Sequence, residues 1–530
     1  MIKLIPQPYK YSYEAGSFNF LKGFTLNYPD VWQNEVDNFV TFAQSQGLNS
    51  NADSLNSIDI VMSDRLAREG YLMNIGDNNI TISASTSAGC FYALTSLKQL
   101  IVAYSSIIPC FQIEDRPRFN YRGFMLDVGR YFYSVQEVKQ YLDLMAMHKL
   151  NYFHWHLTED QGWRIEIKKY PLLTEKSSRR SHTNFNMREH KGYYTQDEIR
   201  EIVEYAHSLH IKVIPEIDMP GHMQAALHAY KELGCFNRKL PVATHWGVKH
   251  DILCGGKPEV RQFIKDIIDE IVELFPDKFI HVGGDEAVKT RWRICPHCQD
   301  EMRRLGLKNE DELQAEFISD INSYIRTKGY STIMWNEDAP TGRLSTDIIW
   351  MAWNVSPEKH EMLHNELKKD RLVINASSEP NYLDLPYSIN SLDRVYTQEL
   401  NFVEANKCMI GVEAPLWTEF VPNMKNAYRK MFPRLGAVAE AAWSEEKNKD
   451  IEAFKKKIPA YYDMLKAYGV TNLPTAKIYN PNKVRAICQR IWWEKRQLTW
   501  HGLHNLIDNA KVKHMVKREH PEMFEEKSKK

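Results

Sequence analysis

The chain has 530 residues, with 68 Lys and Arg against 68 Asp and Glu, and it contains 13 Trp. This length predicts one large domain together with a smaller one. The even balance of charge argues against nucleic acid or an anionic membrane surface as the main partner, and no apolar run approaches the roughly 20 residues that span a bilayer.

The first part of the chain, residues 1–117, has the pattern of a small α+β domain. Three short strand-like runs precede one helical pattern, at 57–62, 70–75, 79–84 and 89–104. The segment ends at a polar break that contains Pro117. Its beginning lacks the long apolar stretch of a signal peptide, so the sequence predicts none within this chain and leaves the compartment open.

The pattern changes from residue 118, where short apolar runs begin to alternate with amphipathic helical stretches. Eight such runs follow one another, at 123–128, 151–157, 212–218, 278–283, 331–335, 347–353, 371–376 and 409–417. Helical patterns lie between several of them, at 135–150, 196–209 and 258–274. Eight strands that alternate with helices over about 350 residues predict an α/β fold with a TIM-type (β/α)₈ barrel, which we place at 118–474.

The last segment, residues 475–530, is rich in Lys and Arg and contains several Trp, among them Trp492 and Trp493. A helical extension that packs on the barrel is the simpler interpretation of this composition. A basic interaction tail is the alternative. The expected organisation is therefore a small domain, a barrel and a C-terminal extension.

Only two of the eight cysteines, Cys295 and Cys298, are close in sequence, in the motif Cys-Pro-His-Cys. A structural zinc site requires about four ligands, and no second pair of this kind is visible. We therefore expect a local disulfide or two free thiols on a turn, and we expect no metal or other cofactor.

The predicted strands end in polar and aromatic side chains, at the place where (β/α)₈ barrels carry their chemistry. These residues are Asp127, Arg130, His154, His156, Glu159, Asp160, Glu216, Asp218, His222, Asp285, Glu286, Trp335, Glu337, Trp353, Tyr382, Asp384, Trp417 and Glu419. Stability alone does not account for polar side chains at every strand end. The sequence therefore predicts a functional site there.

The most informative strand end is the motif His-Val-Gly-Gly-Asp-Glu at 281–286. Its two glycines permit a bend, which would bring Asp285 and Glu286 into one cavity. Adjacent carboxylates shift one another's pKa and can keep one acid protonated near neutral pH. An acid pair in a Trp-lined barrel favours glycoside hydrolysis. The competing interpretation is that the pair caps the following helix with its negative charge.

Two carboxylates adjacent in sequence are poorly placed to flank a sugar ring, as the usual two-carboxyl mechanisms require. A substrate with a 2-acetamido group removes the need for a protein nucleophile, because its own carbonyl oxygen can attack the anomeric carbon. In that mechanism Glu286 protonates the leaving oxygen. Asp285 orients the acetamido N–H and stabilises the charge that develops on it.

Several ordered motifs resemble those of the β-N-acetylhexosaminidases that use substrate-assisted catalysis. The motif at 281–286 is similar to the sequence around that family's catalytic acid pair. The likeness extends to YRGFMLDVGR, HWHLTEDQGWR, EIDMPGH and GVEAPLWTE, at 121–130, 154–164, 216–222 and 411–419. It covers roughly residues 1–470, because the family carries an α+β domain before its barrel, and it leaves 475–530 without a recognised counterpart.

The resemblance implies a retaining exo-hydrolase of oligosaccharides that end in β-linked N-acetylhexosamine, with either GlcNAc or GalNAc at the non-reducing end. It implies that Glu286 is the general acid and then the base for water, and that Asp285 orients the acetamido group. It implies that His222 and Glu159 form a supporting pair beside the acid. The implied sugar contacts are Arg122 on O3 and O4, Tyr382 on the acetamido oxygen, Asp384 on a hydroxyl, Trp335, Trp353 and Trp417 around the N-acetyl methyl and the sugar face, and Glu419 on O4 and O6.

Two other classes of function compete with this interpretation. His154 and His156 at one strand end, with Asp160 and His222, could bind zinc in a metal-dependent barrel hydrolase. The later strand ends argue against it, because they offer Trp rather than further ligands. A carbohydrate-binding protein without catalysis is the third possibility, and the intact acid pair speaks against it.

Overall fold

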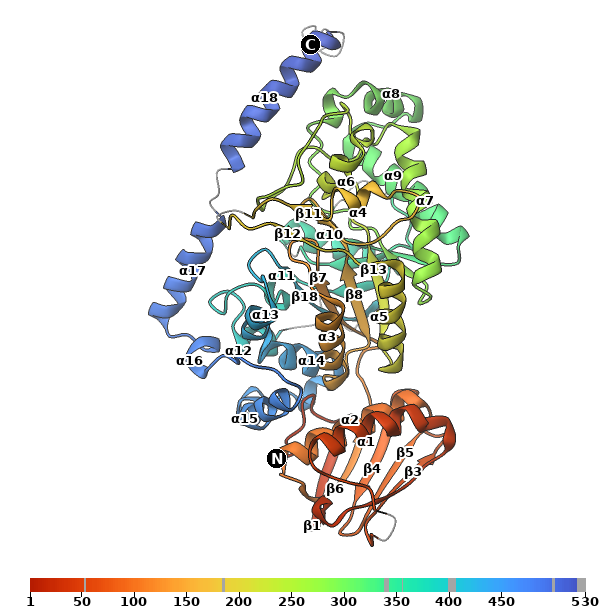
Figure 1. Ribbon diagram of the computed structural model, residues 1–530, viewed down its shortest axis with the longest axis vertical. Helices are drawn as coiled ribbons and strands as arrows, with labels where there is room; N and C mark the ends of the chain where they lie inside the picture. The colour runs from red at the N-terminus through yellow and green to blue at the C-terminus, as the bar shows by residue number, and fades with distance from the viewer. Residues whose placement is uncertain are drawn as a thin grey trace.

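The computed structural model describes residues 1–51, 54–183, 186–337, 343–354, 356–398, 407–497 and 501–521. A small α+β domain lies at one end of a closed barrel, and the C-terminal helices run along the side of the barrel (Figure 1). Residues 498–500 and 522–530 of the expected C-terminal extension lie outside the described residues.

The small domain is a six-stranded sheet with the order β1-β6-β4-β5-β3-β2. Its strands are β1 (Lys10–Asn19), β2 (Thr25–Asn27), β3 (Ser57–Met62), β4 (Tyr71–Ile75), β5 (Asn79–Ala84) and β6 (Ile107–Asp115). Buried and less buried residues alternate along β4 and β5, as in a sheet with one covered face. The helices α1 (Gln33–Ser45) and α2 (Ser87–Ala103) lie between this sheet and the barrel (Figure 1). The three expected strands and the expected helix are confirmed.

The barrel consists of eight parallel strands that close on themselves, so the predicted fold class is confirmed. Its strands are β7 (Tyr121–Asp127), β8 (Tyr152–His156), β13 (Lys212–Glu216), β14 (Phe279–His281), β15 (Ser331–Trp335), β16 (Ile349–Ala352), β17 (Val373–Asn375) and β18 (Met409–Leu416). Each coincides with one of the eight predicted runs, with ends displaced by a few residues. The main outer helices are α3 (Val135–Met147), α5 (Gln196–Ser208), α7 (Pro258–Leu274), α9 (Glu310–Thr327), α10 (Pro357–Leu367) and α14 (Arg434–Trp443).

The loops and crossovers of the barrel contain shorter elements. These are β9 (Thr158–Glu159), β10 (Gly162–Trp163), α4 (Leu172–Glu175), β11 (Arg179–Arg180), β12 (His190–Lys191), α6 (Gln224–Ala229), α8 (Pro296–Leu305), α11 (Ser378–Asn381), α12 (Leu392–Tyr396) and α13 (Met424–Met431). After the barrel come α15 (Ile451–Ala467), α16 (Ala476–Tyr479), α17 (Lys483–Gln497) and α18 (His501–Glu519). The 3₁₀ turns are Phe20–Lys22, Asp30–Trp32, Lys231–Leu233, Trp292–Ile294 and Glu446–Asn448.

Local sequence sets where two of the barrel helices begin. Ser134 caps α3 and Thr195 caps α5, and each hydroxyl accepts a hydrogen bond from the backbone N–H three residues later. In turn, the carboxylates of Glu137 and Glu198 accept hydrogen bonds from the backbone N–H groups of Ser134 and Thr195, respectively. These capping boxes satisfy N–H groups that a helix end otherwise leaves unpaired.

A buried charged network joins the small domain to the N-terminal end of the barrel. Arg122, at the start of β7, is fully buried and contacts Glu69 of the small domain at 2.9 and 3.1 Å. Its guanidinium also donates to the carbonyls of Phe119 and Lys149. The ammonium of Lys149 lies 2.8 Å from Asp115 at the end of β6. The docking of the two domains therefore depends on paired charges as well as on apolar packing.

The C-terminal extension is joined to the barrel loops through α18. Asp508 on this helix forms ion pairs with Arg238 at 2.6 Å and with Arg291 at 2.7 Å. Val512 and Val516 of the same helix are buried. Figure 1 shows α17 beside the barrel and α18 farther along, beside the loops near α6 and α8, with the C-terminal end of α18 projecting beyond them.

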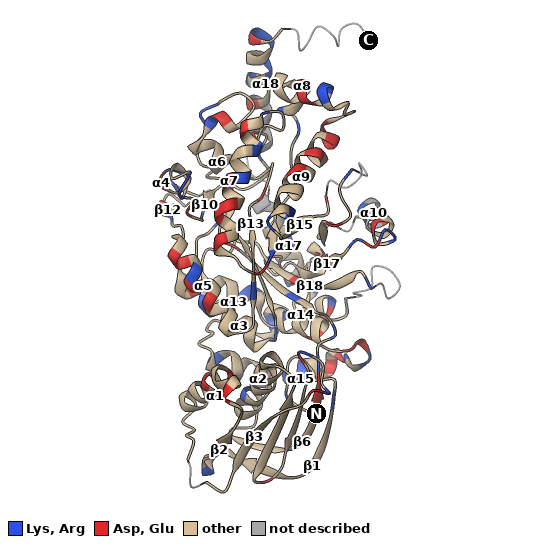
Figure 2. Cartoon of the chain, turned by 90° about the vertical axis from the view of Figure 1, so that its right-hand side faces the viewer, with Lys and Arg blue, Asp and Glu red and all other residues tan. Residues whose placement is uncertain are grey.

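Acidic and basic residues are both spread over the face seen in Figure 2, on which the outer helices α5 and α9 are mainly acidic. No helix among the described residues combines the length and the apolar character that crossing a bilayer requires.

We predict that Arg122→Ala lowers the free energy of unfolding by about 3–5 kcal/mol, because it leaves Glu69 at the domain interface without its cation. Arg118→Ala is the matched control. Arg118 is close in sequence, but its partner Glu446 is 56% exposed, and loss of such a surface pair costs about 0–1 kcal/mol. Urea titration of the two variants measures the difference. Equal losses would show that the Arg122 network contributes nothing beyond a surface ion pair.

Candidate active site

A pocket of about 190 Å³ opens at the C-terminal ends of the barrel strands. Its lining side chains come from the segments after seven of the eight barrel strands and from α17. They are Arg130, Glu159, Asp218, His222, Asp285, Glu286, Trp353, Tyr382, Asp384, Leu385, Trp417, Glu419, Phe420 and Trp493. Acids, one buried arginine and aromatic rings thus share one cavity, which is the composition expected of a site that binds and cleaves a polar ring compound.

The acid pair is positioned by the two glycines that precede it. Gly283 and Gly284 have φ angles of +64° and +98°, in the region that favours glycine. A Cβ atom on Gly283 would lie 1.7 Å from Oδ1 of Asp218. The backbone N–H of Gly284 donates to the same oxygen at 3.2 Å. The turn is therefore specific to glycine, and it leads directly into Asp285 and Glu286.

The two carboxylates of the pair lie in different surroundings. The side chain of Asp285 is 12% exposed, and its Oδ1 is buried without a hydrogen-bond partner. The side chain of Glu286 is 39% exposed and lies 3.5 Å from Nε2 of His222. One carboxylate thus offers an unused acceptor inside the pocket, and the other borders it beside an imidazole.

Electrostatics separates the two acids in the unliganded protein. Burial raises the pKa of Asp285 to about 7. The charge of the nearby His222 acts to lower this pKa, and the negative charge of Glu286 acts to raise it. Burial also acts to raise the pKa of Glu286, but the hydrogen bond and charge of His222 outweigh it, so this pKa is lowered. The expected difference within the pair is present, with Asp285 as the acid that holds its proton more strongly before a substrate binds.

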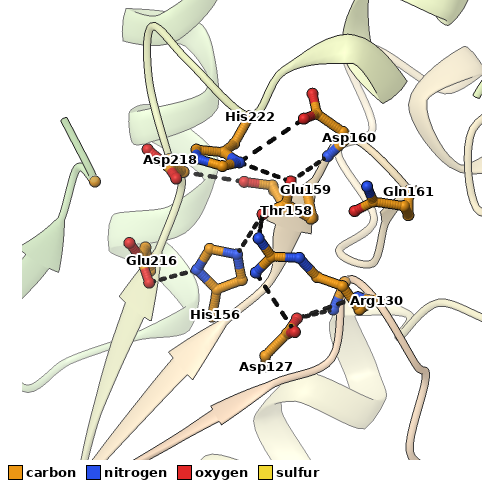
Figure 3. A network of polar contacts seen from close by, with 12 residues as sticks. Asp127, Arg130, His156, Thr158, Glu159, Asp160, Gln161, Glu216, Asp218 and His222 are labelled. Carbon is orange, nitrogen blue, oxygen red and sulfur yellow. Dashed lines mark hydrogen bonds and ion pairs between the residues drawn. The ribbon is translucent and has the colours of Figure 1, made fainter. Parts of the chain in front are cut away.

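A chain of charged side chains runs from Arg130 through Glu159 to His222 (Figure 3). Nδ1 of His222 lies 2.8 Å from Glu159, and Glu159 in turn lies 2.9 Å from Arg130. Burial acts to lower the pKa of His222, but Glu159 and Asp218 raise it well above its ordinary value. His222 is therefore a protonated imidazole, held on one side by Glu159 and facing Glu286 on the other.

The far wall of the pocket carries two further acids. Glu419 lies 3.9 Å from the guanidinium of Arg130, and burial raises its pKa to about 7. Asp384 has a buried Oδ1 without a partner, and burial raises its pKa to about 6. The ring of Trp417 stacks under Arg130 at 4.9 Å. These groups offer hydrogen-bonding atoms next to an aromatic face, which is how proteins hold sugar rings.

The structure brings together nine of the eleven residues predicted for the site: Asp285, Glu286, Tyr382, Asp384, Trp353, Trp417, Glu419, His222 and Glu159. Trp335 differs, because it lies beneath the pocket, is 1% exposed and donates its indole N–H to Glu216 at 2.8 Å. It supports the pocket floor and does not line the cavity.

Arg122 is the clear error among the predicted residues. It lies at the start of β7, at the barrel end that faces the small domain, and its donors are used by Glu69 and backbone carbonyls. A strand rises about 3.3 Å per residue, so residues eight positions apart along this segment lie at opposite ends of the barrel. The arginine of the pocket is Arg130. The rule that chemistry lies at the C-terminal strand ends would have selected it from the sequence.

Leu385, Phe420 and Trp493 are the pocket residues that the sequence left unassigned. The rings of Phe420 and Trp493 are 5.0 Å apart in an edge-to-face arrangement. Trp493 belongs to α17, about 70 residues away in sequence from Phe420. No local pattern indicates that the C-terminal extension reaches the pocket, so only the tertiary structure reveals this contact.

The two strand-end histidines are held by carboxylates. Nδ1 of His156 lies 2.5 Å from Glu216, and Nδ1 of His154 lies 2.9 Å from Glu413. Burial acts to lower the pKa of His154, but Glu413 and Glu216 raise it to about 9. The ring nitrogens of both histidines face carboxylates of the protein itself, which fits the structural role better than the metal-dependent alternative.

Comparison with known proteins identifies the family. The model of the glycosyl hydrolase family 20 catalytic domain matches residues 119–446, and the model of domain 2 of the same family matches residues 1–116. The barrel and its acidic pocket therefore form the catalytic domain of a glycoside hydrolase. The chain belongs to glycosyl hydrolase family 20. The predicted family, fold class and enzyme class are thereby confirmed.

Individual relatives agree with this assignment. A β-hexosaminidase of Porphyromonas gingivalis is 39% identical over 430 residues, which cover 76% of this chain and 54% of that protein. A β-hexosaminidase of Akkermansia muciniphila is 32% identical over 76% of this chain and 87% of its own length. The structure of a β-N-acetylhexosaminidase from Bacteroides fragilis matches 91% of this chain and 99% of its own with a TM-score of 0.79 and 30% identity. The chain thus spans about half of the first relative and most of the other two.

We predict that Asp285→Asn stabilises the protein at pH 8 while leaving its stability near pH 4 almost unchanged. The pKa of an aspartate in an unfolded chain is about 3.9, whereas burial raises that of Asp285 to about 7. As the pH rises between these values, the unfolded state loses its proton and the native state keeps it. The free energy of unfolding therefore falls, and the penalty is complete above pH 7.

Urea denaturation at the two pH values measures this effect, which is on the order of 4 kcal/mol for a shift of about three pKa units. The control is Asp463→Asn, whose side chain is 60% exposed and should show no such pH dependence. If Asp285→Asn and wild type keep the same difference in stability from pH 4 to pH 8, the pKa of Asp285 is not raised.

Proposed function

We propose that the protein removes terminal β-linked N-acetylhexosamine, GlcNAc or GalNAc, from the non-reducing ends of oligosaccharides with retention of configuration. The nucleophile in this proposal is the 2-acetamido oxygen of the substrate, which forms a cyclic oxazolinium intermediate. The observation that carries it is the unpartnered, buried Oδ1 of Asp285 beside the half-exposed Glu286. Asp285 offers an acceptor for the acetamido N–H, and Glu286 is the group that reaches the glycosidic oxygen.

The surroundings of the other pocket acids support a nucleophile from the substrate. Glu159 is engaged by Arg130 and His222, and Asp218 lies against the Gly283–Gly284 turn. A retaining enzyme with its own nucleophile needs a free carboxylate about 5–5.5 Å from the acid across the sugar. Asp285 cannot take that place, because it is adjacent to Glu286 in sequence and lies on the same side of the pocket wall.

In the free protein Asp285 holds the proton of the acid pair, because burial raises its pKa to about 7, and in this mechanism that proton passes to Glu286 when the substrate binds. When a sugar enters, it excludes water from Glu286, and this desolvation raises the pKa of the carboxyl group. His222 faces Glu286 at 3.5 Å and is held protonated by Glu159. Glu286 then donates its proton to the leaving oxygen and afterwards accepts one from the attacking water. Asp285, as a carboxylate, stabilises the positive charge on the acetamido nitrogen.

The remaining pocket residues fit the recognition of one terminal sugar. Arg130, Glu419 and Asp384 offer groups that bind hydroxyls, which assigns to Arg130 the role that the resemblance had given to Arg122. Tyr382 is placed to donate to the acetamido oxygen, and Trp353 and Trp417 supply apolar faces. The ionic cluster of Asp127, Arg130 and Glu159 closes one end of the pocket, which favours an exo-acting enzyme. The intermixed surface charge fits a neutral oligosaccharide better than a nucleic acid.

A pair of aryl glycosides with the same leaving group tests this function. We predict that the β-N-acetylglucosaminide is hydrolysed and that the β-glucoside, which lacks the acetamido nucleophile, is cleaved very poorly. The β-anomer should form first in proton NMR. A thiazoline analogue of the cyclic intermediate should bind far more tightly than N-acetylglucosamine. Comparable rates on the two glycosides, or first release of the α-anomer, would exclude substrate assistance.

A second test addresses Glu286. We predict that Glu286→Gln lowers turnover of natural disaccharides by about 10²–10⁴-fold, because general acid catalysis is lost. Cleavage of aryl glycosides with good leaving groups should suffer less in the first step. The matched control is Glu201→Gln on the outer helix α5, whose side chain is 55% exposed and which should behave as wild type. Wild-type turnover of disaccharides by Glu286→Gln would refute the assigned role.

A further inference from the structure

Four cysteines from three separate segments meet beside the barrel. Cys295 and Cys298, at the start of α8, are joined by Cys235 and Cys254 from the crossover between β13 and β14. The four sulfur atoms all lie within 4.8 Å of one another. All of these cysteines are free, so of the two expected alternatives for Cys295 and Cys298, a local disulfide or two free thiols, the disulfide is absent. The fold thus brings Cys235 and Cys254, a second pair of thiols that the sequence did not reveal, next to Cys295 and Cys298.

The spacing of the sulfur atoms matches a metal site. The Sγ atoms of Cys254 and Cys298 are 3.6 Å apart, those of Cys254 and Cys295 are 3.8 Å apart, and those of Cys235 and Cys298 are 3.9 Å apart. A tetrahedral zinc ion with bonds of about 2.3 Å to sulfur places its ligands about 3.8 Å from one another. A disulfide would require about 2.05 Å.

The protein around the cluster is built to hold it rigidly. Cys254, Cys295 and Cys298 are buried, and the N–H of Cys254 donates to the carbonyl of Leu233 at 2.9 Å. Gly256 packs so tightly that a Cβ atom there would lie 2.1 Å from the carbonyl oxygen of His297. The segment that carries Cys254 and the segment that carries Cys295 and Cys298 are therefore in close contact through their backbones.

The charge of four thiolates around a divalent cation is also accommodated. Cys295 is the N-cap of α8 and Cys298 lies in its first turn, where the helix dipole favours negative charge. The buried ammonium of Lys257 donates to the carbonyls of Glu232 and Gly234, on the segment that leads to Cys235. Both features bring positive charge to the neighbourhood of the sulfur atoms.

We propose that Cys235, Cys254, Cys295 and Cys298 form a structural zinc site with four thiolate ligands. None of the four lines the active-site pocket, and a closed set of four ligands leaves no position for substrate. The site ties the crossover after β13 to the loop that follows the acid pair. Cross-bonds between the same segments, from Arg291 to Asp251 at 3.2 Å and from Trp292 to Leu253 at 2.9 Å, continue this junction. A zinc ion at this site holds the segment that follows Glu286 in a fixed position.

Metal analysis of the purified full-length protein tests this proposal without measuring activity, so its outcome is independent of the proposed function. We expect about one zinc ion per chain after desalting, and a protein without visible absorption. A mercurial that reacts with thiols should release the zinc to a chromogenic chelator. Cobalt(II) incorporated in place of zinc should give the visible spectrum of a tetrahedral thiolate complex.

Two variants separate the cluster from the other thiols. Cys254→Ser should lose most of the bound zinc and melt at a lower temperature, because one of four ligands is removed. Cys90→Ser is the matched control, since Cys90 is a buried thiol in α2 of the small domain, and it should retain the full zinc content. If Cys254→Ser does not fold, the metal content and the cobalt spectrum of the wild type still decide the question.

Three results would overturn the proposal. The first is wild-type protein with no stoichiometric zinc and eight thiols that titrate freely. The second is a disulfide among the four cysteines in mass spectrometry of the native protein. The third is stoichiometric iron with the visible absorption of an iron–thiolate centre, which would show the same geometry used for a different metal.

Discussion

The buried carboxylate of Glu216 connects the strand ends on which the active site is built. It ends β13 and is contacted by His156 at 2.5 Å and His154 at 3.0 Å from β8, and by the indole N–H of Trp335 at 2.8 Å from β15. Burial acts to raise its pKa, but the surrounding histidines lower it well below the ordinary value. A charge buried without such partners costs several kcal/mol, so strands from different parts of the chain are held in one arrangement.

From this carboxylate a line of alternating charges runs toward the pocket. His156 contacts Glu159, and Glu159 holds His222 (Figure 3). His222 in turn faces Glu286. Each group is oriented by the one before it, so the position of Glu286 depends on atoms several residues deep in the barrel. Asp285 stands outside this line with an unpartnered oxygen. In the free protein, Asp285 is thus buried with an unsatisfied oxygen, which lowers the stability of the fold. A ligand that donates a hydrogen bond to this oxygen relieves that penalty.

The two ends of the barrel use arginine for opposite purposes. At the N-terminal end, Arg122 is surrounded by Glu69 and backbone carbonyls and joins two domains. At the C-terminal end, Arg130 faces Asp127, Glu159 and Glu419 around an open cavity. The beginnings of barrel strands serve stability and their ends serve chemistry. The four-cysteine cluster extends the second role, because it anchors the loops that surround the pocket.

The sequence alone determined the barrel strands and pointed to the acid pair. Hydrophobic periodicity and paired glycines act over a few residues, so the eight strands, several of the helices and the turn at Gly283 could be predicted. Contacts between distant segments depend on how the barrel closes, and no local pattern encodes them. Only the tertiary structure therefore decided that Trp335 lies beneath the pocket, that Trp493 reaches it, and that Cys235 and Cys254 meet the pair at Cys295.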